Sequence, residues 1–137
     1  MWDQAIPVLT LGEDTCRDLT RRLEQTYIDA NQFYSAYRFA LNQSDPVARF
    51  MFLYNILLQI NNDDQKQVDA SIRSEVPSIP QSPRPDRPSV IETAYSRLRN
   101  EVGHKRSGTP PEQTRRKIQD NVATFQELVR TAISRVV

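Results

Sequence analysis

The sequence has 137 residues, of which 26% are charged, and a formal net charge of +1. A chain of this length suits one domain that buries about two thirds of its unfolded surface around a single core, and we expect residues 1–137 to form that domain. Its longest apolar run, residues 50–60, is interrupted by Asn55 and Gln59 and is far shorter than the roughly 20 residues of a membrane span. No segment of the sequence is therefore expected to span a membrane.

The start of the chain and its cysteine content indicate the compartment. Residues 1–7 lack the basic region and apolar stretch of a secretion signal, and Cys16 is the only cysteine. A reducing compartment suits an unpaired thiol. We therefore expect a cytoplasmic protein with no membrane association.

The charge is distributed unevenly along the chain. Residues 1–72 carry six basic and ten acidic side chains, residues 73–117 carry ten basic and five acidic ones, and the remainder is balanced. A basic stretch suits a polyanionic ligand such as RNA. It is also compatible with a solvated surface that binds nothing.

Helical spacing recurs in every long segment, and no convincing alternation of apolar and polar residues indicates a strand. The first helix is predicted to begin at Asp14 or Thr15, either of which can cap the free backbone amides, and to end near Asn42. Its apolar residues recur at spacings of three and four and form one stripe. Three tyrosines on this stripe could stack bases if exposed, but their position favours the core: Tyr27, Tyr34 and Tyr37.

The next two predicted helices follow after short connections. Asp45 and Pro46 form an N-cap and a first helical residue, so a second helix is expected from there to Ile60, antiparallel to the first. It is apolar nearly all round, which predicts a central position.

A shorter accessory helix is predicted over residues 63–74. Three acids here could hold a hard cation, but their spacing matches no calcium loop and favours solvated side chains: Asp63, Asp64 and Asp69.

Five prolines in residues 76–88 predict an extended loop within the domain, which is either a plain connector or a proline-rich recognition segment. Ser89 and Glu92 have the spacing of a capping box and predict a third long helix from Ser89 to about Val102. Thr109 and Glu112 repeat the pattern before a last amphipathic helix. The predicted fold class is all-α, an up-and-down bundle of four long helices plus a short accessory helix.

The third predicted helix ends in the segment that could carry chemistry, Arg99-Asn100-Glu101-Val102-Gly103-His104, which contains the only histidine. On a continuous helix His104 would lie about 140° round from Arg99, too far to share a site. Gly103 stands where a left-handed turn usually ends a helix, and such a turn would bring His104 back toward Arg99.

This pair of residue types suits RNA cleavage. Neutral imidazole can take the proton of a ribose 2′-hydroxyl, and a guanidinium can hold the scissile phosphate through two N–H groups as charge builds on it. The reaction would need no metal and no other cofactor. Further side chains are expected to bind the substrate or line the site: Arg97, Glu101, Lys105, Arg106, Arg115, Arg116 and Lys117.

Residues 95–104 resemble the Arg-x4-His signature of the HEPN superfamily, including the asparagine that often follows its arginine. The order of elements is also similar to that family over most of the chain. The resemblance implies a helical bundle, commonly dimeric, that acts as a metal-independent endoribonuclease in toxin–antitoxin, antiphage defence or RNA-processing systems, in some cases with an antitoxin or partner domain. It implies that Arg99 and His104 are the catalytic pair and that Asn100 helps to order them.

One histidine limits what a single chain can build. It supplies neither a pair of catalytic histidines nor a zinc site with several histidine or cysteine ligands, whereas a twofold dimer would add a second Arg99 and His104. We therefore expect a homodimer with the motif at its interface.

Two other hypotheses remain open. The chain could be a non-catalytic HEPN-like module that binds a nucleotide, RNA or a protein near the Arg99–His104 segment. Alternatively the chain could be a purely structural helical dimer, in which His104 contacts the last helix carbonyls and Arg99 covers apolar surface with its stem.

Overall fold

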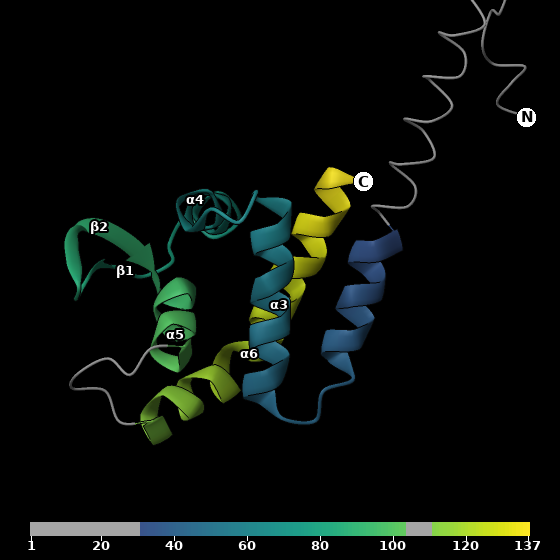
Figure 1. Cartoon of the computed structure of the whole chain (residues 1–137), viewed down its shortest axis with the longest axis horizontal. Coiled ribbons are helices and arrows are strands. Elements are labelled where there is room, and N and C mark those ends of the chain that lie inside the picture. Colours follow the sequence, from purple (N-terminus) through teal and green to yellow (C-terminus); the bar gives the residue numbers. More distant parts are fainter. Residues whose placement is uncertain (1–30, 104–110) are drawn as a thin grey trace, which may run out of the picture.

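The computed structural model describes residues 31–103 and 111–137. Residues 31–41 are helical and are followed by five helices or strands before a last long helix (Figure 1). These elements are α3 (Pro46–Ile60), α4 (Gln65–Glu75), β1 (Gln81–Arg84), β2 (Arg87–Thr93), α5 (Ala94–Gly103) and α6 (Pro111–Val136). The prediction of a mainly helical protein is confirmed. Within the described ranges, no helix has the length and apolar character needed to cross a bilayer.

α3 begins where the sequence predicts. Asp45 has extended φ and ψ angles of −78° and 123°, and its carboxylate accepts a hydrogen bond from the amide of Ala48 at 3.2 Å. Pro46 occupies the first helical turn, where its missing N–H costs nothing. The helix ends before a turn in which Asn62 and Asp63 have left-handed φ angles of 58° and 59°. The predicted accessory helix follows with its start shifted to Gln65.

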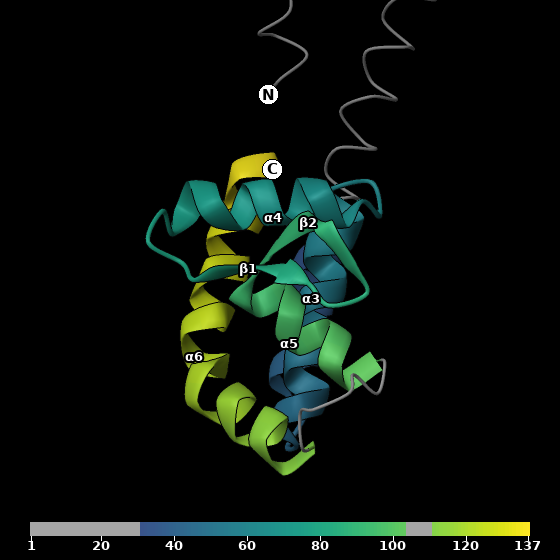
Figure 2. The same ribbon diagram turned by 90° about the vertical axis from the view of Figure 1, so that its left-hand side faces the viewer.

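The core lies where α3, α6 and α5 meet, with α4 crossing over one end of α3 and α6 (Figures 1 and 2). The Phe125 ring of α6 lies at its centre, 4.8 Å from the ring of Phe50 and 4.6 Å from that of Tyr95, measured between centroids. Large apolar side chains from three helices, α3, α4 and α6, complete the core, namely Leu53, Tyr54, Ile56, Leu57, Val68, Ile72, Ile118, Val129 and Ile133. The apolar face predicted for α6 and the central position predicted for α3 are therefore confirmed.

A β-hairpin replaces the predicted proline-rich loop and the first turn of the predicted third helix. β1 pairs antiparallel with β2, so the expectation that residues 76–88 form an extended loop is wrong over residues 81–88. The expected helix start at Ser89 is also wrong, because α5 begins at Ala94. β-branched residues at three of the four positions 90–93 suit a strand.

Burial explains why the capping box at Ser89 does not form. Glu92 and Thr93 belong to β2 and are fully buried, and their side chains are held by groups on α4 and α5. A capping Glu92 would instead lie beside the amide of Ser89, at the surface. Tertiary contacts therefore outweigh the local signal. The finer prediction of a four-helix up-and-down bundle stays a prediction.

We expect the substitution Phe125→Ala to lower the free energy of unfolding by about 3–5 kcal/mol, because it removes a ring that is wholly buried against other rings. Phe39→Ala is the matched control, since 54% of that side chain is exposed, and it should cost well under half as much. Urea titration followed by circular dichroism measures both. Equal losses in the two variants would contradict this placement of the core.

Candidate functional site

A buried carboxylate joins α4 to the start of α5. Oδ1 of Asp69 accepts hydrogen bonds from the amide of Thr93 at 3.1 Å, from the Thr93 hydroxyl at 2.7 Å and from the Ser96 hydroxyl at 2.6 Å. Only 2% of Asp69 is exposed. The expectation that Asp69 is a solvated acid is therefore wrong, and no cluster of three metal-ligating side chains occurs in the described ranges.

The same network continues to α3. The Tyr54 and Ser96 hydroxyl oxygens lie 2.7 Å apart, and because Ser96 gives its own hydrogen to Asp69, Tyr54 must donate to Ser96. Burial raises the pKa of the Tyr54 phenol to about 12. Its proton is therefore held throughout the neutral range, and α3 is linked to α5 by a hydrogen-bonded chain.

Asn100 forms a second buried cluster one turn further along α5. Its Nδ2 donates to Glu92 Oε2 at 3.1 Å and to Gln65 Oε1 at 3.2 Å, and its Oδ1 accepts from Arg99 Nη1 at 3.2 Å. Two acceptors on the nitrogen side and one donor on the oxygen side fix the orientation of this amide. Asn100 therefore connects the first residue of α4 and the strand β2 to the Arg99 guanidinium.

Arg99 lies half-buried between α5 and α3. Its guanidinium carbon is 5.5 Å from the centroid of the Tyr54 ring, a distance at which a cation is attracted to the ring face. Beside it is a shallow pocket of about 230 Å³, lined by Met51, Phe52, Tyr54, Asn55, Leu58 and Arg99. Asn100 and Tyr54 together hold a positive charge at the edge of this pocket.

Several other residues predicted for the site hold elements of the fold together. Arg97 donates to Glu101 at 3.4 Å and to the Ser82 hydroxyl at 2.9 Å, and Glu101 also accepts from Thr114 at 3.2 Å. Because only 3% of the Glu101 side chain is exposed, it joins α5 to α6 rather than presenting a free carboxylate.

The remaining predicted residues divide into two groups. Arg115 forms an ion pair with Asp45, which connects α6 to the start of α3, whereas Arg116 and Lys117 are exposed on α6. His104, Lys105 and Arg106 lie outside the described residues. The structure thus brings Arg97, Arg99, Asn100 and Glu101 together on α5.

The predicted left-handed turn at Gly103 is wrong. Gly103 is the last residue of α5, and its φ lies outside the left-handed range. The helix therefore continues one residue beyond the predicted end at Val102, and His104 follows directly.

Two of the three tyrosines on the first predicted helix lie in the described part of the chain. Tyr37 is buried, and its hydroxyl donates to the carbonyl of Gln126 on α6 at 3.4 Å, while Tyr34 is half-buried beside the core. Both therefore pack with the core as the helical stripe indicates. Tyr27 lies outside the described residues.

The sequence did not predict the buried hydrogen-bond network of Asp69, Thr93 and Ser96. Thr93 accepts a hydrogen bond from the amide of Ser96 and so is the N-cap of α5. A threonine directly before the apolar spacing of Tyr95 and Leu98 is a recognisable cap, but Ser89 and Glu92 offered a more complete signal. Nothing local indicated Asp69, whose partners lie 24 and 27 residues away.

Comparison with protein families identifies the family to which the chain belongs. A family model described as methylamine utilization protein MauJ matches residues 33–136, which extend from the first described helix to the last residue of α6. The chain therefore belongs to the MauJ family, a HEPN-like family. No curated protein and no solved structure gives a significant match.

The raised pKa of Tyr54 predicts a loss of stability in alkali. In the unfolded chain a tyrosine loses its proton near pH 10, whereas the folded protein keeps that of Tyr54 to about pH 12. The unfolded state then binds fewer protons between these values, so the free energy of unfolding falls as pH rises through them. Urea titrations from pH 8 to 11.5 should show that the free energy of unfolding falls less steeply with pH in Tyr54→Phe than in the wild type. If the two plots of this free energy against pH are parallel, the burial of the phenol is contradicted.

Proposed function

We propose that this protein is a metal-independent endoribonuclease of the HEPN type, in which Arg99 and His104 act on the RNA phosphate and Asn100 orders them. The observation that carries the proposal is the position of Arg99, whose guanidinium is held at a surface pocket by a buried asparagine and an aromatic ring. An arginine whose stem only covers apolar surface needs neither the hydrogen bond to Asn100 nor the contact with the Tyr54 ring.

The chemistry follows from the donors that Arg99 has left. One of its N–H groups bonds to Asn100, and a guanidinium has five, so a bidentate grip on a phosphate remains possible. His104 takes the proton of the ribose 2′-hydroxyl, the 2′-oxygen bonds to phosphorus, and the bond to the 5′-oxygen breaks with return of a proton. The products are a 2′,3′-cyclic phosphate and a 5′-hydroxyl.

Binding of the RNA backbone would use the cations that are not neutralised by internal pairs. Arg116 and Lys117 are exposed and form no ion pair among residues 31–103 and 111–137. Lys105 and Arg106 are proposed to add to them. The helix α5 continues through Gly103 without the turn that would bring His104 back toward Arg99 of its own chain. We therefore also propose that a homodimer places two motifs side by side, so that His104 of one chain lies beside Arg99 of the other and the second histidine that one chain lacks is supplied.

A second candidate function is a non-catalytic module that binds RNA or a nucleotide in the same pocket. The observation in its favour is that Arg97 and Arg115, two of the predicted substrate contacts, are engaged in ion pairs with Glu101 and Asp45. Such a surface binds polyanions less strongly than the sequence suggests.

Labelled single-stranded RNA incubated with the protein in EDTA tests the enzymatic proposal. We expect cleavage that ends in a 2′,3′-cyclic phosphate and a loss of about 10²–10³ in rate for Arg99→Ala and for His104→Ala, as for removal of one charge-stabilising group. Arg99→Lys should retain little activity, because an ammonium cannot grip the phosphate in two places.

Arg38→Ala is the matched control, since Arg38 is exposed and its side chain, among the described residues, donates only to Ser35 on its own helix. It should cleave at the wild-type rate. If the wild type leaves the RNA intact at high protein excess, the enzymatic proposal fails. RNA binding that weakens steeply with added salt would then support the second candidate.

A further inference from the structure

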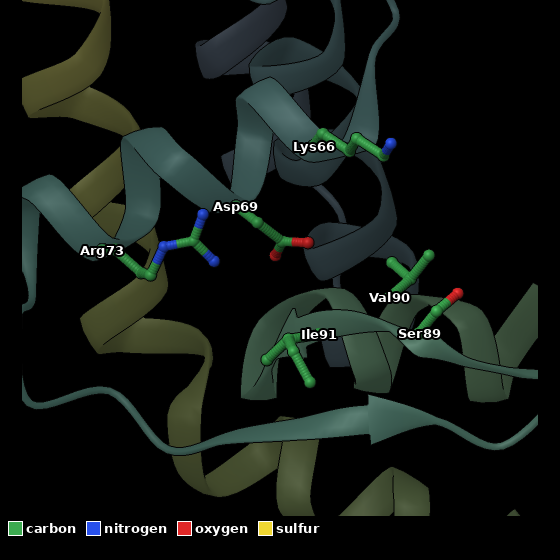
Figure 3. Close-up of a pocket in the computed structure, with 6 residues that line it drawn as sticks. All are labelled: Lys66, Asp69, Arg73, Ser89, Val90 and Ile91. Atoms are coloured by element: carbon green, nitrogen blue, oxygen red, sulfur yellow. The ribbon is translucent and has the colours of Figure 1, made fainter.

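A groove of about 310 Å³ lies between α4 and β2, on the side of β2 that faces away from β1 (Figure 3). Figure 3 shows the Asp69 carboxylate pointing from α4 toward the segment of β2 that carries Ile91, with Lys66 and Arg73 on either side. The groove is lined by Lys66, Asp69, Arg73, Ser89, Val90 and Ile91.

The edge of β2 that faces this groove carries backbone groups that bond to no other residue in the ranges 31–103 and 111–137. The amide of Ala94 donates to the carbonyl of Pro80 at 2.9 Å, so Pro80 and Ala94 form a hydrogen-bonded pair. Hydrogen-bonded and non-hydrogen-bonded pairs alternate along an antiparallel ladder. Pro83 and Ile91 therefore form a non-hydrogen-bonded pair, in which the backbone groups of each residue point away from the partner strand. The amide and carbonyl of Ile91 point toward α4.

The two edges of the hairpin differ in their capacity to accept another strand. On β1 the outward positions are Gln81 and Pro83, and because Pro83 has no N–H it hinders further pairing along this edge. On β2 the outward residue is Ile91, which keeps its donor, and 47% of its surface is exposed. The edge of β2 is thus the one that can pair.

Asp69 already imitates a neighbouring strand at the next outward position. Its Oδ1 accepts the hydrogen bond from the Thr93 amide that a strand carbonyl would otherwise accept. The other oxygen, Oδ2, accepts no hydrogen bond from the part of the chain that is described. Every buried side-chain oxygen there has a partner, so Oδ2 must reach the groove that Asp69 lines.

The groove also carries positive charge that the fold does not use. Lys66 and Arg73 lie three residues before and four residues after Asp69 on the same face of α4. Neither forms an ion pair with a described residue, and Arg73 donates only to the amide oxygen of Gln81, at 3.3 Å. An occupant with carboxylates would be attracted from both sides.

We propose that an extended acidic peptide segment of a partner protein binds here as an added strand on β2. Its backbone exchanges two hydrogen bonds with Ile91, one of its N–H groups donates to Asp69 Oδ2, and its acidic side chains lie near Lys66 and Arg73. Strand addition of this kind derives affinity from backbone hydrogen bonds and selectivity from side chains. The site is separate from the pocket at Arg99 and does not depend on ribonuclease activity.

The probe is the peptide acetyl-Glu-Val-Glu-Val-Glu-amide, titrated into the ¹⁵N-labelled full chain. We expect saturable shifts of the amide signals that are largest at Ile91 and Thr93. The same peptide with lysine in place of glutamate should bind about tenfold more weakly or worse, and a version with N-methylated backbone amides should not bind. Absence of shifts, shifts centred on other elements, or equal binding of all three peptides would overturn the proposal.

Two variants separate the backbone interaction from the charge. Asp69→Asn keeps an oxygen for Thr93 and Ser96 but presents an NH₂ group to the groove, so a peptide N–H loses its acceptor and affinity should fall. Lys66→Glu reverses an exposed charge without touching the core and should weaken binding by about tenfold. Lys117→Glu, an equal change on exposed α6, is the control and should bind as the wild type does. Circular dichroism checks that each variant is folded, and unchanged affinity in folded Lys66→Glu would contradict the site.

Discussion

The arrangement of α4, β2 and α5 depends on one oxygen atom, Oδ1 of Asp69. It accepts three hydrogen bonds in a place where only 2% of the residue is exposed. A carboxylate is costly to bury unless its hydrogen-bonding capacity is used, and here the donors are fixed by the start of α5. The helix can begin only where Thr93 and Ser96 both reach this oxygen, and the first turn of a helix also favours a negative charge beside it.

This anchor determines the position of the candidate catalytic residue. Ser96 is one turn before Arg99 on α5, so fixing Ser96 fixes the direction in which Arg99 leaves the helix. Tyr54 completes the arrangement, because its hydroxyl donates to Ser96 while its ring faces the Arg99 guanidinium. The groove beside β2 and the pocket beside α3 are thus connected through a continuous set of hydrogen bonds.

Features specified by neighbouring residues could be predicted, and features specified by distant ones could not. Asp45 and Pro46 predicted the start of α3, and the apolar spacing around Phe125 predicted α6, since caps and periodicity are local. The strand over residues 87–93 was missed because Ser89 and Glu92 carry a local helix signal that the burial of Glu92 overrides. For the candidate site, Arg99 and Asn100 were predicted from a motif, whereas the positions of Asp69 and Gln65 beside them depend on contacts across the fold.

A layer of polar residues inside a small core needs a reason, because apolar replacements of similar volume often stabilise a protein. An apolar face on α5 would allow the helix to slide or rotate against its neighbours with little change in contact energy. The paired donors and acceptors of Ser96 and Asn100 permit one arrangement only. Glu101 fixes the end of α5 in the same way through Thr114. The polar core thus sets the position and direction of α5, and with them the point from which the chain continues to His104.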